Sequence, residues 1–178
     1  MRPAVPEKGG GVAPLDPKRI LSALAKHGVQ YVLIGALAAR LQGFPRATYD
    51  ADITPAKGRD NLERLVSALR ELGARVYTDQ VPEGLPFDCT APMLARADTW
   101  NLITDAGRLD LAFKPSGTEG YDDLARHAVH FTIYDDDVRV ARLEDIIRSK
   151  AAADRPQDRQ DVAVLREMLK RQGGRPSE

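Results

Sequence analysis

Apolar and polar residues follow two different periods along the chain. Apolar residues recur every third or fourth position in residues 16–28 and 60–73, which is typical of amphipathic helices. Residues 30–34 form a short and almost wholly apolar run, as expected of a central strand buried on both faces. Residues 48–54 carry polar side chains at every second position, as in a strand with one polar face. The order of these segments predicts a mixed α/β (α+β) fold in which helices flank a sheet.

The second half of the chain predicts two hairpins followed by two helices. Residues 99–104 and 108–113 lie on either side of an Asp-Ala-Gly turn, which indicates an antiparallel hairpin. Residues 129–134 and 138–141 flank three consecutive aspartates, and we expect these to form a turn rather than a metal site. The other expected elements are a strand at 75–78, short helices at 37–41, 91–96 and 121–126, and C-terminal helices at 143–153 and 156–169.

Two helix starts carry local sequence signals. Asp16 followed by Pro17 is a typical start, because the carboxylate can accept a free N–H group and proline suits the first turn. Asp60 and Glu63 have the spacing of a capping box, so we expect Asp60 to cap the next long helix. Asn61, which follows Asp60, is expected to belong to that helix start.

Length and composition indicate one domain. The chain has 178 residues, of which 43% are apolar, and this is enough for one packed core. We expect a disordered lead-in at 1–14, a core at 15–141, a helical pair at 142–171 that completes the same domain, and a tail at 172–178.

Charge and residue usage exclude several classes of protein. Lys and Arg together number 26, as do Asp and Glu, so no global basic field favours non-specific binding to nucleic acid. The single cysteine, Cys89, excludes an internal disulfide and a cysteine-rich zinc site. No apolar run approaches the roughly 20 residues of a membrane span, and the N-terminus lacks the apolar core of a signal peptide. The sequence therefore predicts a cytoplasmic protein without a membrane partner.

Three acidic residues are the main candidates for chemistry. Asp50 and Asp52, two positions apart on a strand, point to the same face of a sheet. Asp110 alternates with large apolar residues in the second strand of the first hairpin. Carboxylates on neighbouring strands form a hard-oxygen site that suits Mg²⁺, although an Asp-x-Asp pair alone is also common as a solvated pair. Gly35, at the end of the apolar strand, can leave backbone N–H groups directed at a phosphate.

The order of these residues resembles a known family. The chain has a strand, Gly35-Ala36, a short helix, Arg46-x-Thr48-x-Asp50-x-Asp52, Asn61 at a helix start, and later Leu109-Asp110-Leu111. This order is similar to the nucleotidyltransferase (DNA polymerase β-like) superfamily, in which a third acid follows an Asp-x-Asp or Asp-x-Glu pair. The C-terminal segments, Leu143-Glu144-Asp145 with Lys150 and Arg155-Pro156-x-Asp158-x-x-Asp161, resemble the ending of AbiEii and MenT-type toxin nucleotidyltransferases. The resemblance covers about residues 20–169.

The resemblance implies a mixed sheet flanked by helices, with the C-terminal helices packed on it, and an NTP as substrate. Asp50, Asp52 and Asp110 would hold Mg²⁺, as two ions, and Asp110 would act as general base for an attacking hydroxyl or only as a ligand. Contacts to the nucleotide would come from six residues, namely Gly35, Ala36, Arg46, Lys150, Asp158 and Asp161.

Four of the six nucleotide contacts have a structural alternative. Lys150, Asp158 and Asp161 can equally form an ion-pair cluster between two packed helices. Arg46 can pair with a local acid at the surface instead of meeting a phosphate. Thr48 is expected to be an ordinary strand residue.

Three functions are compatible with these residues. The first is transfer of a nucleoside monophosphate to a hydroxyl such as a tRNA 3′ end, by a toxin with a cognate antitoxin. The second is modification of a small molecule of the antibiotic type. The third is a catalytically degenerate relative that binds a nucleotide or a partner, because Ala36 stands where the family has Gly or Ser. RNA would be favoured if a basic stripe lay beside Asp52, formed by Arg40, Arg46, Arg59, Arg148 and Arg155.

Overall fold

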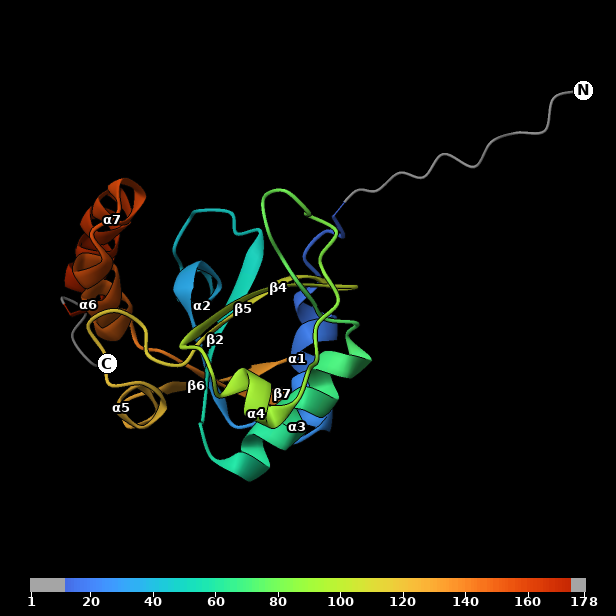
Figure 1. Cartoon of the computed structure of the whole chain (residues 1–178). Coiled ribbons are helices and arrows are strands. Elements are labelled where there is room, and N and C mark those ends of the chain that lie inside the picture. Colours follow the sequence, from blue (N-terminus) through green and yellow to red (C-terminus); the bar gives the residue numbers. More distant parts are fainter. Residues whose placement is uncertain (1–11, 174–178) are drawn as a thin grey trace, which may run out of the picture.

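The computed structural model describes residues 12–173, and within them a seven-stranded mixed sheet separates two groups of helices (Figure 1). The strands are Tyr31–Ile34 (β1), Asp50–Pro55 (β2), Arg75–Val76 (β3), Thr99–Thr104 (β4), Gly107–Ala112 (β5), Val129–Ile133 (β6) and Asp136–Val140 (β7). Their order in the sheet is β3-β4-β5-β2-β1-β7-β6. The strand β1 is antiparallel to β2 and parallel to β7, and β2 is parallel to β5.

Helices lie on both sides of the sheet (Figure 1). They are Pro17–Lys26 (α1), Gly35–Leu41 (α2), Arg59–Glu71 (α3), Ala91–Leu94 (α4), Tyr121–Ala125 (α5), Leu143–Ala153 (α6) and Pro156–Gly173 (α7). In the view of Figure 1, α1 and α3 lie on one side of the sheet, whereas α2, α6 and α7 lie on the other. The mixed α/β fold with flanking helices that the sequence predicts is confirmed.

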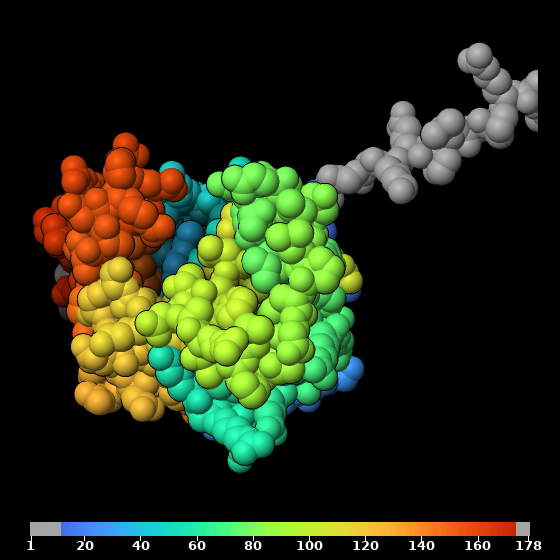
Figure 2. All heavy atoms as spheres, viewed as in Figure 1, coloured from blue at the N-terminus to red at the C-terminus, as the bar shows by residue number. Residues whose placement is uncertain are grey.

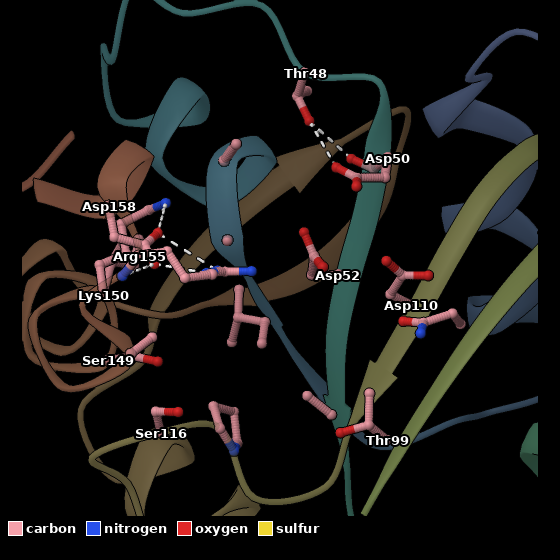
Figure 3. A pocket seen from close by; sticks show the side chains of 18 of the residues that line it. Thr48, Asp50, Asp52, Thr99, Asp110, Ser116, Ser149, Lys150, Arg155 and Asp158 are labelled. Atoms are coloured by element: carbon pink, nitrogen blue, oxygen red, sulfur yellow. Dashed lines mark hydrogen bonds and ion pairs between the residues drawn. The ribbon is translucent and has the colours of Figure 1, made fainter. Parts of the chain in front are cut away.

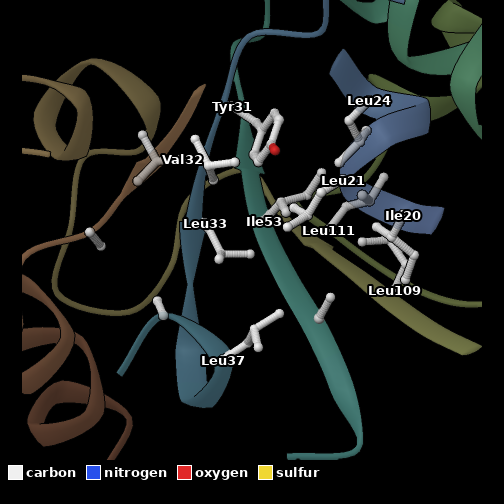
Figure 4. Close-up of a cluster of buried hydrophobic side chains, with 14 of the residues drawn as sticks. Ile20, Leu21, Leu24, Tyr31, Val32, Leu33, Leu37, Ile53, Leu109 and Leu111 are labelled. Carbon is white, nitrogen blue, oxygen red and sulfur yellow. The ribbon is translucent and has the colours of Figure 1, made fainter. Parts of the chain in front are cut away.

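The main core lies between the sheet and α1. Leu109 and Leu111 on β5 are fully buried and face this side, together with Ile53 on β2 (Figure 4). Removing each such side chain from water contributes roughly 1.5–3 kcal/mol to folding. Because side chains alternate along a strand, burying Leu109 and Leu111 places Arg108 and Asp110 on the opposite face.

The parallel pairing of β2 with β5 sets the register of the charged residues. Asp52 lies beside Asp110, and Asp50 lies beside Arg108. Residues that face one another in this way share a face of the sheet. Four charged side chains therefore occupy adjacent positions on the face that α1 does not cover.

The two predicted helix starts have different outcomes. Asp16 caps α1 as predicted, and its Oδ1 accepts a hydrogen bond from the Arg19 backbone N–H at 3.1 Å. The capping box is wrong, because α3 follows Gly58 without a side-chain cap and Asp60 lies inside its first turn. Asn61 is buried in this helix start, where its amide joins the backbone of Gln30 and Ala56.

The second hairpin turns earlier than the sequence predicts. Tyr134 and Asp135 both have positive φ, 51° and 71°, which is typical of a two-residue hairpin turn. Asp136 and Asp137 belong to β7 and accept hydrogen bonds from Ser22 and His130. The prediction that the whole acidic triplet forms the turn is therefore wrong, since only Asp135 does so.

Several element boundaries also differ from the prediction. The strand β2 begins at Asp50, so Thr48 is not a strand residue, and its hydroxyl donates to the Asp50 carbonyl at 2.9 Å. The helix α7 continues to Gly173, beyond the predicted end at Leu169. The predictions for residues 1–11 and 174–178 lie outside the described part of the chain. Between residues 12 and 173, no helix is both long enough and apolar enough to cross a membrane.

Candidate functional site

The three candidate acids meet on the face of the sheet that α1 does not cover. Asp50 and Asp52 come from β2, and Asp110 comes from the parallel neighbour β5. One ligand oxygen from each carboxylate lies within 4.8 Å of the other two. Figure 3 shows the three side chains in the same cleft. Such a set of hard oxygen ligands fits a divalent cation.

The electrostatics of the three acids also fit a cation. Burial, followed by the negative charges of Asp50 and Asp110, raises the pKa of Asp52 to about 7, while Lys150 and Arg108 partly oppose this rise. The pKa of Asp110 is raised mainly by burial and also by Asp50, with Arg108 acting in the opposite direction. Carboxylates so close together repel one another, and a bound cation would relieve that repulsion.

Glycine is required at position 35 because the backbone there lies against the Asp52 carboxylate. Gly35 begins α2 with φ of 70°, a conformation that favours glycine. A Cβ atom at this position would collide with the Asp52 carboxylate. The sequence suggests Gly35 as a phosphate cradle, and the structure adds that it provides the space for Asp52. Gly35 and Ala36 both line the cleft.

A cluster of ion pairs forms the opposite wall of the cleft. Lys150 Nζ on α6 lies 3.3 Å from Asp158 Oδ1 and 3.0 Å from Asp161 Oδ2, and both acids are on α7. Arg155 Nε lies 2.7 Å from Asp158 Oδ2, and Arg46, in the loop before β2, pairs with Asp161. The predicted ion-pair cluster between two packed helices is thus present, and it faces the cleft (Figure 3).

The two carboxylates of this wall, Asp158 and Asp161, are buried, and nearby cations balance their negative charges. Only 2% of Asp158 and 4% of Asp161 is exposed. Burial by itself would raise the pKa of Asp158, but Arg155 and Lys150 outweigh it and hold the pKa below its usual value. Asp158 therefore stays ionised at neutral pH. Asp161 is paired directly with two cations, Arg46 and Lys150.

The two walls enclose an open cleft of about 1430 Å³. Figure 2 shows this hollow between the orange C-terminal helices and the green segment that follows α3. The acids of β2 and β5 lie on one side, and α6 with the start of α7 lies on the other. The cleft is large enough for a nucleotide together with a second small molecule.

The arrangement of sheet, helices and cleft was compared with known proteins. No protein-family model and no curated protein matches the chain. The chain is similar in structure to the lincosamide antibiotic adenylyltransferase LnuA in its lincomycin-bound form, with a TM-score of 0.56 and 14% identity over 87% of this chain and 99% of that chain. It is also similar to ANT(2″)-Ia in complex with adenylyl-2″-tobramycin, with a TM-score of 0.50 and 19% identity over 85% of this chain and 86% of that chain.

The chain has a nucleotidyltransferase fold. The fold that the sequence resemblance implies is thereby confirmed. Neither similar structure bears on the AbiEii and MenT-type branch of the superfamily, which stays a prediction.

Two residues of this nucleotidyltransferase fold were not predicted to belong to the site. Arg108 Nη2 lies 3.1 Å from Asp110 Oδ2, and the Arg108 guanidinium carbon lies 4.1 Å from the centre of the Tyr77 ring. The alternation that places Asp110 on the polar face places Arg108 there too, so the sequence could have indicated Arg108. Tyr77 reaches it only through the pairing of β3 with β4, which no local signal indicates.

The basic stripe that would favour RNA does not form beside the acids of the nucleotidyltransferase fold. Arg59 pairs with Glu63, and Arg148 pairs with Asp123 and Asp145. Arg40 donates to the Arg46 backbone carbonyl at 3.4 Å. Of the five arginines, only Arg46 and Arg155 line the cleft.

Proposed function

We propose that this chain transfers a nucleoside monophosphate from an NTP to a hydroxyl group and releases pyrophosphate. The observation that supports this most strongly is the placement of three carboxylates across one cleft from Lys150, Arg46 and Arg155. One wall suits divalent cations and the other suits phosphates. An NTP with its metal ions would span the two walls.

Asp50, Asp52 and Asp110 would hold Mg²⁺, because they offer hard oxygen ligands and repel one another without a cation. When bound, the metal neutralises triphosphate charge and lowers the pKa of the attacking hydroxyl. The proposal of two ions is supported by the sequence resemblance.

Lys150, Arg155 and Arg46 would contact the triphosphate. Arginine binds phosphate oxygens with two parallel N–H groups, and lysine acts as a compact charge. Asp158 and Asp161 would act indirectly, because each already holds two of these cations in place. Gly35 and Ala36 line the same cleft and would offer backbone N–H groups.

The proposed reaction balances with the residues present. The acceptor oxygen forms a bond to the α-phosphorus, and the bond from that phosphorus to the oxygen of pyrophosphate breaks. Asp110 would take the acceptor proton on a carboxylate oxygen, since it lies on the side of the triad away from Lys150 (Figure 3). Its raised pKa suits a general base.

A small hydroxylated molecule is the acceptor that the cleft favours. The part beyond Asp110 is lined by polar residues of β4 and of the loop after β3, among them Thr99, Asn101 and the exposed Asp79. Two cations lie nearest to it, Arg108 and Lys114, and Lys114 is paired with Glu119. RNA binding needs cations for the phosphate backbone. The two similar structures contain lincomycin and adenylyl-2″-tobramycin, which are both small molecules.

A transfer assay tests this function. The chain is incubated with Mg²⁺, each of the four α-labelled NTPs and a panel of hydroxylated antibiotics, and labelled product is separated by chromatography. We expect metal-dependent transfer to at least one acceptor, with loss of at least about 100-fold in Asp50→Ala. Transfer that Asp50→Ala leaves intact would exclude the proposed site.

The same protein preparation tests two alternative functions. The toxin function with a tRNA acceptor is supported by the sequence resemblance alone, and it predicts label on total tRNA together with growth inhibition that Asp52→Ala abolishes. A degenerate relative, suggested by Ala36, predicts that an NTP binds in calorimetry but releases no pyrophosphate, whichever acceptor is present.

A further inference from the structure

Arg108 is a basic residue that lies among the acidic residues on the sheet face of the cleft. It lies beside Asp50 in the β2–β5 register, while Asp110 lies beside Asp52. Arg108 and Asp110 are two positions apart on β5, so their side chains leave the same face. A cation on the sheet itself is thus placed beside three carboxylates that repel one another.

The guanidinium of Arg108 is held from two sides. Its Nη2 donates to both carboxylate oxygens of Asp110, at 3.1 and 3.5 Å, and its planar face lies on the Tyr77 ring. Its Nε is buried and has no hydrogen-bond partner. The hydrogen bonds to Asp110 are therefore the polar contact that holds the Arg108 side chain. The cation–π contact with Tyr77 is separate from these hydrogen bonds.

We propose that Arg108 is a resident counter-ion of the acid triad, which gives up Asp110 when a divalent cation binds there. This inference rests on the proposed metal site. A metal ion and a guanidinium compete for the same carboxylate, because both draw on its negative charge. Tyr77 then keeps the released guanidinium on the acceptor side of the cleft. Arg108 is a positioning residue in this scheme, since it acts through Asp110.

Competition between Arg108 and a metal ion for Asp110 predicts how strongly variants bind the metal. Removing Arg108 should tighten the binding of a divalent cation, whereas loss of a residue with only a structural role would weaken it. The probe is Mn²⁺ alone, which takes the same oxygen ligands as Mg²⁺ and is detected as the free ion by electron paramagnetic resonance. Neither NTP nor acceptor is needed for this measurement.

Three variants separate the effect of the positive charge of Arg108 from the effect of its contacts. We expect Arg108→Met to lower the Mn²⁺ dissociation constant roughly five- to twentyfold, because a cation beside the site is gone. Arg108→Lys keeps the charge and should stay within about threefold of wild type. Lys114→Met is the matched control: Lys114 lines the same cleft but pairs with Glu119, so its removal should change the constant less than about twofold.

A thermal measurement without metal tests the pair directly. In EDTA, Arg108→Met should lower the melting temperature by about 2–4 °C in the wild-type background, because Asp110 loses its counter-ion. In the Asp110→Asn background the same substitution should cost less than about 1 °C, since the pair is already broken. Equal losses in both backgrounds would contradict the proposal.

The outcomes distinguish this inference from the proposed function. If wild type binds no Mn²⁺ at millimolar concentration, the metal site fails and both proposals fall. If wild type binds Mn²⁺ and Arg108→Met binds it equally or more weakly, only the counter-ion role is overturned. Tighter binding by Arg108→Met, with Lys114→Met unchanged, supports it.

Discussion

The burial of Asp52, together with the negative charges beside it, makes a prediction about stability. Its pKa in the folded protein is raised from 3.8 to about 7, so between these values the folded state binds more protons than the unfolded state. The stability of the metal-free protein therefore falls as the pH rises through this window. Asp52→Asn removes that loss, and we expect a melting temperature about 2–4 °C above wild type at pH 8 and nearly equal to it at pH 4.

The measurement is thermal unfolding in EDTA at the two pH values. Adding Mg²⁺ at pH 8 should then raise the melting temperature of wild type and leave Asp52→Asn unchanged. A stabilisation by Asp52→Asn that is equally large at pH 4 would show that the charge is not its cause.

Gly35 allows a second test at a single residue, because Gly28 provides a matched control. Both glycines have similar positive φ, 70° and 66°, so alanine should cost each about 1 kcal/mol of backbone strain. Only at Gly35 would the new Cβ collide with Asp52, whereas at Gly28 its nearest neighbour is 3.9 Å away. We expect Gly35→Ala alone to weaken Mn²⁺ binding, by at least about tenfold. Equal metal binding by the two variants would contradict the role given to Gly35.

Single residues differ in how far the sequence reveals them. Asp50, Asp52 and Asp110 follow from strand alternation, because each lies opposite buried residues in its own strand. The collision that requires Gly35 depends on how α2 meets β2, so the sequence suggests a phosphate contact but not this reason. Tyr77 reaches Arg108 across two strand pairings. The turn at residues 105–107 indicates the pairing of β4 with β5, but no local pattern indicates that of β3 with β4.

The elements α6 and α7 are joined by the ion pairs of Lys150. Lys150→Met would leave the buried carboxylates of Asp158 and Asp161 short of a cation, and we expect it to cost about 3–5 kcal/mol of unfolding free energy. The control is Lys170→Met, which breaks an exposed pair with Glu167 and should cost less than about 1 kcal/mol. Urea unfolding of the two variants measures the difference. Similar costs would mean that the cluster does not hold α6 and α7 together.

Local signals predicted element types better than element ends. The acidic residue at Asp16 caps a helix, whereas the similar signal at Asp60 lies inside one, because Asn61 makes the long-range hydrogen bonds that fix where α3 begins. The second hairpin turns at Tyr134 and Asp135, whereas the acidic triplet 135–137 predicts a later turn. These ends depend on tertiary contacts, which outweigh local propensity.

For the whole molecule, the cleft exists because distant segments converge. The acid wall comes from β2 and from β5, which is its parallel neighbour although four elements separate them in the chain. The cation wall comes from the C-terminal helices and from Arg46. Periodicity predicts each piece, but the order of strands depends on long-range pairing, which no local pattern contains.

This convergence predicts that metal and nucleotide stabilise the molecule together. A triphosphate alone would place its negative charges opposite Asp50, Asp52 and Asp110, so NTP without metal should raise the melting temperature by less than about 2 °C. With Mg²⁺ and NTP at about 100 times the dissociation constant, binding adds about 2.7 kcal/mol, or about 5–10 °C. Asp50→Ala should lose this joint effect because a metal ligand is gone. Lys150→Met should lose it too, because a phosphate contact on the opposite wall is gone. A full shift with NTP in EDTA would mean that the nucleotide binds away from the acids.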